Sequence, residues 1–305
     1  MKFGKLESVQ GLDLHLPEDP IMNEQTLKKI QAPPGTPSIY LGCTGWSNKE
    51  WIGSIYPPKC KPVDFLKYYS RQLGTVEMNT THYRIPSIEQ VQKWVECTEK
   101  DFRFCPKVPQ SISHRKEFGI PSGLLHAFVE SACYFEDRMG CCFMQLPPYF
   151  GIEKWNSLKE VLKIIRQNLP IAVEFRHPSW YQDKSKLRRI FYEMQEMDVY
   201  PVITDVAGRR DVLHCILSGS KVLIRFVGNA HLESDTARLK EWSERLAKWI
   251  QGGLSEIYFF LHQESNLDAV NLCGLFKEQL LQKLPNIQIK TPRNYPNGDA
   301  QMELF

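Results

Sequence analysis

The chain has 305 residues, of which 42% are hydrophobic and 24% are charged, and its formal net charge is +3. This composition is typical of a globular protein and excludes a disordered chain. A net charge this small excludes nucleic-acid binding by bulk charge, so any such contact would need a local patch.

The start of the chain lacks the features of a targeting or membrane segment. Residues 1–11 contain lysines but no apolar run behind them. Apolar runs elsewhere, such as 257–261, are far shorter than the ~20 residues that cross a bilayer. The nine cysteines are scattered without the spacing of a zinc knuckle. We therefore expect a cytoplasmic protein with reduced thiols and no membrane contact.

Residues 1–37 carry mixed charge and little periodicity, and prolines punctuate their end. We interpret 1–37 as an N-terminal extension on the outside of the folded domain, helical near 26–31. From residue 38 onward, short apolar runs alternate with segments whose apolar residues have helical spacing.

The predicted strands are 39–43, 75–79, 102–107, 140–146, 171–176, 199–205, 222–227 and 257–261. The predicted helices are 63–73, 87–98, 124–135, 152–168, 184–197, a weaker 209–217, 236–250 and 267–284. Helix 87–98 has Ser87 as its N-cap, with Gln90 completing a capping box.

Strands that alternate with helices in this way form a parallel sheet, and eight such units close into a barrel. The predicted fold class is therefore α/β, a single parallel (β/α)8 TIM-like barrel over residues 38–285, followed by a flexible tail over 286–305. An open doubly wound sheet is the alternative, but no G-x-G-x-x-G motif follows the first strand.

Polar residues gather where the predicted strands end, which is where parallel barrels place their functional groups. Those in the strands and the loops that follow are Trp46, Glu77, Asn79, Tyr83, Lys107, Gln145, Glu174, Arg176, His177, Asp205, Arg225 and His262. Side chains alternate along a strand, so Glu77 and Asn79 share one face and Glu174 and Arg176 share another. We expect both glutamates and Arg176 to point into the barrel.

These residue types suit acid-base chemistry on an anionic substrate. The candidate catalytic residues are Glu77, Glu174, His177 and Asp205. The three carboxylates could act as general base or hold a divalent cation, and His177 could serve as acid, base or ligand. The cations Lys107, Arg176 and Arg225 suit a phosphate or carboxylate. The candidate substrate-binding residues are Trp46, Asn79, Tyr83, Lys107, Gln145, Arg176, Arg225 and His262. No metal motif such as H-E-x-x-H is present, so the metal ligands stay undefined.

Structural interpretations of the same residues stay open. The buried charges could form a salt-bridge lattice that fills the barrel. His177 could fix the turn before Pro178. Trp46, Trp51 and Trp180 could be packing residues, or they could stack on a flat ligand such as a base or a sugar.

The chain resembles the YecE-like family, a domain-of-unknown-function family with a TIM-barrel fold, from about residue 39 to 276. The motifs that carry the resemblance are G-C-T-G-W at 42–46, with Trp51 and Y-P-P at 56–58, then E-M-N-T-T-H-Y-R at 77–84, F-R-F-C-P-K at 102–107, Q-L-P at 145–147, A-V-E-F-R-H-P-S-W at 172–180, Asp205, and 225–228. The resemblance implies the barrel and places the polar strand-end residues within the family pattern, but it implies no reaction.

This sequence departs from the family pattern in two places. His82 stands where an aromatic residue is usual, and L-H-Q-E at 261–264 replaces an asparagine-rich segment after the last strand. These departures suggest that His262 and Glu264 are specific to this branch of the family.

The chain ends in Q-M-E-L-F at 301–305, after a polar stretch with two prolines. This end resembles the Q-x-x-L-F peptide by which bacterial replication and repair proteins bind the beta sliding clamp. The resemblance implies that Leu304 and Phe305 fill an apolar pocket while Gln301 forms hydrogen bonds beside it. Alternatively, Leu304 and Phe305 pack back onto the barrel.

Three functional hypotheses follow from these features. The first is a hydrolase, metal-assisted or not, that acts on an anionic substrate derived from nucleic acid and is recruited to the sliding clamp by its tail. The second is a non-catalytic module that binds a nucleotide or a nucleic-acid end. The third is a small-molecule hydrolase such as a glycosidase.

Overall fold

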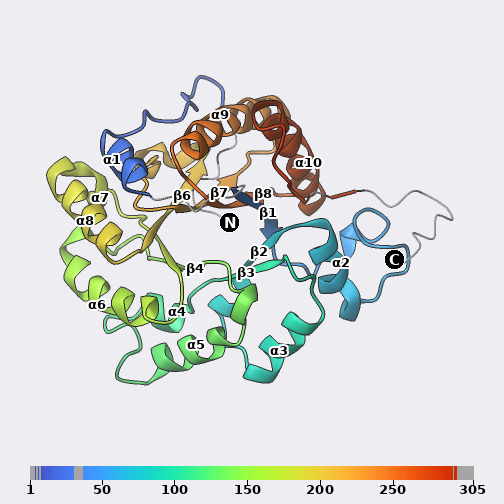
Figure 1. Ribbon diagram of the computed structural model, residues 1–305, viewed down its shortest axis with the longest axis horizontal. Coiled ribbons are helices and arrows are strands. Elements are labelled where there is room, and N and C mark those ends of the chain that lie inside the picture. The colour runs from blue at the N-terminus through green and yellow to red at the C-terminus, as the bar shows by residue number, and fades with distance from the viewer. Residues whose placement is uncertain (1–3, 5, 7, 31–36, 291, 294–305) are drawn as a thin grey trace.

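The computed structural model describes residues 4, 6, 8–30, 37–290 and 292–293. Its core is a barrel of eight parallel strands, in the order β3-β2-β1-β8-β7-β6-β5-β4, with helices around it (Figure 1). The strands are β1 Ser38–Thr44, β2 Thr75–Met78, β3 Arg103–Pro106, β4 Cys142–Gln145, β5 Ile171–Glu174, β6 Tyr200–Val206, β7 Lys221–Val227 and β8 Glu256–His262. The predicted TIM-like α/β barrel is therefore confirmed.

Helices cover the outside of the barrel because each buries one apolar face against the strands. The helices are α1 Met22–Lys29, α2 Phe65–Gln72, α3 Ile88–Glu96, α4 Gln110–Ser113, α5 Leu124–Cys133, α6 Trp155–Arg166, α7 Ser179–Gln182, α8 Lys184–Glu196, α9 Leu232–Gln251 and α10 Asn266–Lys283. The Ser87 hydroxyl accepts a hydrogen bond from the Gln90 amide, so the predicted N-cap of α3 is present. No helix in the described part of the chain is long and apolar enough to cross a membrane.

The barrel closes between β3 and β4 through a seam rather than through a regular ladder. Two isolated parallel bridges, Phe104 with Met139 and Lys107 with Phe143, join the strands there. The backbone hydrogen bond from Gly140 to the Phe104 carbonyl measures 2.8 Å, and the bond from Val108 to Phe143 measures 2.8 Å. A Cβ atom at Gly140 would approach both Cys105 Sγ and Tyr258 to 2.9 Å, so the close approach at the seam depends on glycine.

The barrel interior has an apolar layer and a charged layer. Phe143, Tyr200, Leu223 and Tyr258 belong to a buried cluster that occupies the amino-terminal part of the interior. Side chains alternate across each strand, so Gln145 follows Phe143 and Arg225 follows Leu223 on the inner face. On β6 and β8 the next inward residues, Val202 and Phe260, still belong to the apolar cluster. The barrel interior is therefore packed with apolar side chains at the amino-terminal ends of the strands and is polar at their carboxyl ends.

The N-terminal segment lies on the outside of the barrel against α9 and the chain after β6. Asn23 Nδ2 donates to the Cys215 carbonyl at 2.6 Å, and the Leu217 amide donates to Asn23 Oδ1 at 2.9 Å. Asp19 Oδ1 forms a 2.9 Å ion pair with Arg245 of α9. Helix α1 begins at Met22, four residues before the predicted helical stretch, whose last residue, Gln31, lies outside the described residues.

The weaker helix predicted over 209–217 is wrong. The structure has a 3-10 helix, η6 Ala207–Val212, with non-helical backbone angles at Arg209. Residues 213–217 are all buried and have no helical conformation. The physical reason is the pairing with Asn23, whose amide group satisfies the backbone polar groups of an extended segment.

Candidate functional site

Arg225 lies at the centre of the charged layer and binds two glutamates from strands across the barrel. Its Nε and Nη2 atoms donate to Glu77 Oε2 and Oε1 at 2.8 and 2.9 Å. Its Nη1 atom donates to Glu174 Oε2 at 2.8 Å. The predicted inward orientation of both glutamates is therefore present, and a bidentate arginine joins them.

All three of these side chains are buried and charged. Burial alone would raise the pKa of Glu174, but Arg176 and Arg225 outweigh it and hold this pKa at about 2. The pKa of Glu77 likewise lies well below its ordinary value, because Arg225 and His262 outweigh the effect of burial. Carboxylates held this far into the ionised form are poor proton donors near neutral pH.

Two further predicted residues complete the surroundings of Glu77. His262 Nε2 lies 2.9 Å from Glu77 Oε2. Asn79 Nδ2, in the 3-10 helix η3 Asn79–His82, donates to Glu77 Oε1 at 2.9 Å. Glu77 thus has hydrogen-bond partners on both oxygens, as a buried carboxylate requires.

Lys107 lies at the seam and faces Gln145 of β4. Its Nζ atom donates to Gln145 Oε1 at 3.0 Å. The side chain is buried, and within the described chain no carboxylate lies within ion-pair distance of it. Burial and the neighbouring Arg225 lower the pKa of Lys107 to about 8, so a substantial fraction of this amine is neutral under mildly basic conditions.

Arg176 is the second cation on the open side of the charged layer. Its Nε atom donates to Glu174 Oε1 at 2.6 Å. Its carbonyl accepts a 3.0 Å hydrogen bond from Arg209 Nη2, which holds the turn after β5. Lys107 and Arg176 each retain 6% of their surface exposed, whereas Arg225 below them has none.

A row of rings lies beside the two cations. His82 and His114 have ring centroids 5.5 Å apart, and His82 lies 5.3 Å from the ring of Tyr83. The Tyr149 hydroxyl donates to the His114 carbonyl at 3.3 Å. Burial and Lys107 lower the pKa of His82 to about 4 and lower that of His114 too, so both rings are neutral at physiological pH. Tyr83 is 75% exposed and Tyr149 62% exposed.

His114 and Tyr149 were not among the predicted site residues. They lie on loops after β3 and β4, well past the strand ends, where periodicity indicates nothing about direction. The one sequence signal was His82, because a histidine in place of the usual aromatic residue indicates a polar partner nearby, which the structure identifies as His114.

The other predicted residues lie further from Arg225. His177 Nδ1 accepts from the backbone amide of Ser179 at 3.1 Å and lies 2.8 Å from the Ser179 hydroxyl, which matches the interpretation as a turn residue. Trp51 and Trp180 are fully buried, at 1% and 0% exposed, and serve as packing. Trp46 is half-buried and packs edge-on against Trp94.

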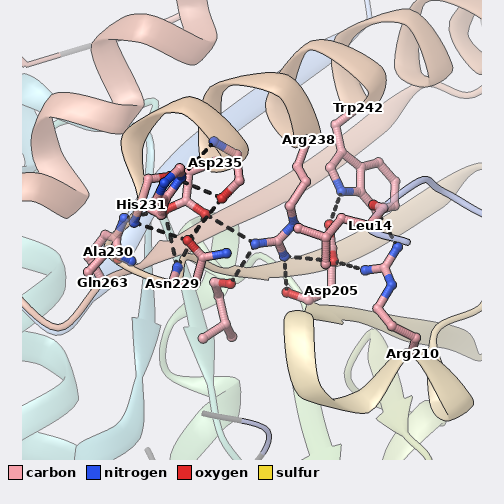
Figure 2. A network of polar contacts seen from close by, with 12 residues as sticks. Leu14, Asp205, Arg210, Asn229, Ala230, His231, Asp235, Arg238, Trp242 and Gln263 are labelled. Atoms are coloured by element: carbon pink, nitrogen blue, oxygen red, sulfur yellow. Dashed lines mark hydrogen bonds and ion pairs between the residues drawn. The ribbon is translucent and has the colours of Figure 1, made fainter. Parts of the chain in front are cut away.

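Asp205 points out of the barrel, away from the two glutamates. Figure 2 shows it on the outer side, between Arg210, Arg238 and Trp242. Arg238 Nη2 donates to its Oδ1 at 2.7 Å, and Trp242 Nε1 donates to its Oδ2 at 2.8 Å. Burial opposes ionisation of Asp205, but Arg238 and Arg210 hold its pKa below the ordinary value. The structure thus gives Asp205 an anchoring position under α9 and the N-terminal segment.

The same network reaches the loop after β7, where many barrels bind phosphate. The Asp235 carboxylate accepts from the Asn229 amide at 3.1 Å and from Gln263 Nε2 at 2.7 Å, as Figure 2 shows. These donors are therefore already occupied by a carboxylate of the chain itself. The cations Lys107 and Arg176 lie elsewhere in the mouth, just after the ends of β3 and β5.

The donor set does not fit a metal ion. Among the described residues, no group of three or more histidine, cysteine, aspartate or glutamate side chains could hold one. The oxygens of Glu77 and Glu174 are bound instead by arginine, histidine and asparagine.

The tail lies largely outside the described residues, including the predicted clamp-binding residues Gln301, Leu304 and Phe305. Where it is described, the chain after α10 contacts the barrel. Lys290 forms an ion pair with Asp101, and the Arg293 amide donates to Gln72 Oε1 at 2.8 Å.

Comparison with known proteins identifies the family. The family model described as "Protein of unknown function DUF72" matches residues 40–296. Proteins named "UPF0759 protein YecE" from two Escherichia coli strains are 29% identical over 267 residues, covering 82% of this chain and 95% of theirs. A solved DUF72 family structure from Enterococcus faecalis is 25% identical with a TM-score of 0.64, covering 82% of this chain and 98% of that one. Another, from Thermotoga maritima, is 24% identical with a TM-score of 0.56, covering 79% and 98%. A barrel of this form, matched by the family model over most of its length, shows that the chain belongs to the DUF72 family.

Proposed function

We propose that the mouth of the barrel is the active site of a hydrolase that binds an anionic substrate through Lys107 and Arg176. The observation that supports this most is the buried Lys107 amine, which has no carboxylate partner among the described residues. The charged layer has three cations and two carboxylates, Glu77 and Glu174, and is therefore short of one negative charge. A bound phosphate or carboxylate supplies that charge.

The ring row favours a substrate with a flat group. Tyr83 is exposed beside the neutral imidazole of His82, and Tyr149 is exposed with its hydroxyl bonded to the His114 carbonyl. Aromatic faces bind bases by stacking. A nucleotide or a nucleic-acid end combines a flat base with a phosphate. This combination makes a nucleic-acid-derived substrate the best match.

In its neutral form, with the anion held by Arg176, Lys107 is the group best suited to take a proton from an attacking water. Its pKa of about 8 is near the working pH, whereas the two glutamates are strongly acidic and bound to arginines. The donor set gives no support to metal assistance. A glycosidase needs one protonated carboxylic acid, which neither Glu77 nor Glu174 supplies.

The experiment is calorimetric binding of inorganic phosphate and of nucleoside monophosphates to the full chain, with Lys107→Met and a matched Lys159→Met variant. Lys159 is paired with Glu193 on the outside of the barrel. We expect binding to be lost in Lys107→Met and kept in Lys159→Met. Equal binding in both variants would contradict the proposed site.

Turnover separates the hydrolase from a non-catalytic module. Oligonucleotides and phosphate esters incubated with the protein should release product, and the release should stop in Lys107→Met. Binding of a nucleotide with no product from any of these substrates would favour the module that recognises a nucleotide or a nucleic-acid end.

We also propose that the terminal peptide at 301–305 recruits the protein to the bacterial beta sliding clamp. The support is the match of Gln301, Leu304 and Phe305 to the clamp-binding pattern. A fluorescent peptide of residues 291–305 should bind purified clamp, and changing Leu304 and Phe305 to alanine should abolish the binding. A peptide that does not bind would remove the link to DNA replication.

A further inference from the structure

Lys107 has an environment that anion binding alone does not explain. Arg225 and Arg176 are already present in the charged layer, and a guanidinium binds phosphate or carboxylate better than an ammonium does. A third cation beside them is repelled by both. A lysine, unlike an arginine, can relieve this repulsion by losing its proton.

The geometry keeps the amine ready to react. Gln145 Oε1 accepts one hydrogen from Nζ at 3.0 Å, which fixes the side chain across the seam without neutralising it. The residue is buried except for a 6% exposed fraction, so few water molecules can hydrate the charged form. Arg176, also 6% exposed, lies on the same open side and can hold an anionic group of a ligand.

We infer that Lys107 is a nucleophilic amine that forms a reversible imine with a carbonyl compound carrying a carboxylate or phosphate. The inference rests on the proposed anion site, because Arg176 would hold the anionic group. Nζ forms a bond to the carbonyl carbon and gives a carbinolamine. The carbonyl oxygen then leaves as water with the two amine hydrogens, and a C=N bond replaces C=O. No oxidant or reductant takes part in this exchange.

The test traps the imine by reduction. The full chain is incubated with pyruvate or with dihydroxyacetone phosphate, then reduced with cyanoborohydride, and the modified residue is located by peptide mass spectrometry. Acetone serves as the carbonyl compound without an anionic group. We expect one added group at Lys107 with both anionic compounds and background labelling with acetone. The yield should rise with pH through the Lys107 pKa of about 8.

The matched variants are Lys107→Arg and Lys221→Arg. Lys221 stands at the other end of the barrel and has a carboxylate partner, Glu256, at 2.8 Å. Trapping should vanish in Lys107→Arg and persist in Lys221→Arg. If Lys107→Arg unfolds, as circular dichroism would show, Lys107→Met replaces it, and the labelled site in the wild-type protein still decides.

Phosphate binding measured on the same samples keeps the two proposals apart. Wild-type protein that binds phosphate but is not labelled at Lys107 would overturn the imine and leave the anion site standing. Protein that does neither would overturn both. Labelling spread over many lysines, with no preference for Lys107, would also overturn the imine.

Discussion

Replacing Arg225 with methionine should destabilise the protein strongly at neutral pH and much less in acid. The substitution removes a buried guanidinium that donates to both Glu77 and Glu174 and leaves two carboxylates in a desolvated layer. Breaking a buried ion pair from one side costs about 3–5 kcal/mol. Methionine has a length similar to that of arginine, so the loss of stability reflects the missing charge more than a change in side-chain volume.

The pKa of Glu174 sets an upper limit on the part of this loss that passes through Glu174. Its lowering from 4.5 to about 2 corresponds to about 3 kcal/mol, since a tenfold change in proton affinity is worth about 1.4 kcal/mol, and Arg176 and Arg225 share this effect. The folded pKa lies below the unfolded one, so this stabilisation is present above about pH 4.5 and is lost as the pH falls toward 2. Without Arg225 the carboxyl groups take up protons at higher pH in the folded state. The difference between wild type and variant should therefore shrink as the solution is acidified.

Urea unfolding at a series of pH values measures this difference directly. Arg245→Met is the control, because Arg245 pairs with Asp19 on the outside of the barrel and should cost less. A wild-type-to-variant difference that stays constant with pH would refute the electrostatic reasoning and assign the loss to packing.

Three further substitutions test the scaffold by urea unfolding. Gly42→Ala should lower the free energy of unfolding by at least about 3 kcal/mol, because the new Cβ would lie 2.1 Å from the Thr75 carbonyl oxygen and push β1 away from β2. An unchanged urea midpoint would contradict this packing. Asn23→Ala should cost about 1–3 kcal/mol, since it leaves buried backbone groups at Cys215 and Leu217 unsatisfied, and faster proteolysis of the N-terminal segment should accompany the loss. Asp183→Ala should cost about 1 kcal/mol, as its carboxylate caps α8.

The alternation of side chains along a strand predicted which residues point into the barrel wherever apolar neighbours marked the outer face. Val173 and Phe175 set the outer face of β5, so the inward direction of Glu174 followed. Strand β6 has apolar residues on both faces, with Val202 and Val206 on one and Ile203 on the other, so its sequence does not show which way Asp205 points. Asp205 was therefore grouped with the glutamates although it faces α9.

The parts that sequence could not predict depend on contacts between distant segments. Asn23 and Leu217 are separated by 194 positions, and their hydrogen bond turns a predicted helix into an extended segment. His82 and His114 meet through two loops whose course depends on the packed barrel. Neither local propensity nor periodicity contains this information.

The seam between β3 and β4 has a consequence for how the barrel opens and closes in solution. Amide protons there lack the repeated ladder that protects the other strand pairs, so we expect them to exchange with solvent soonest within the sheet. The hydrogen bond from Lys107 to Gln145 links the two sides of the seam at the mouth of the barrel. A ligand that engages Lys107 adds to the link between the two sides. Slower hydrogen exchange at the Val108 amide would then show that a ligand occupies the mouth, even a ligand that the protein does not convert.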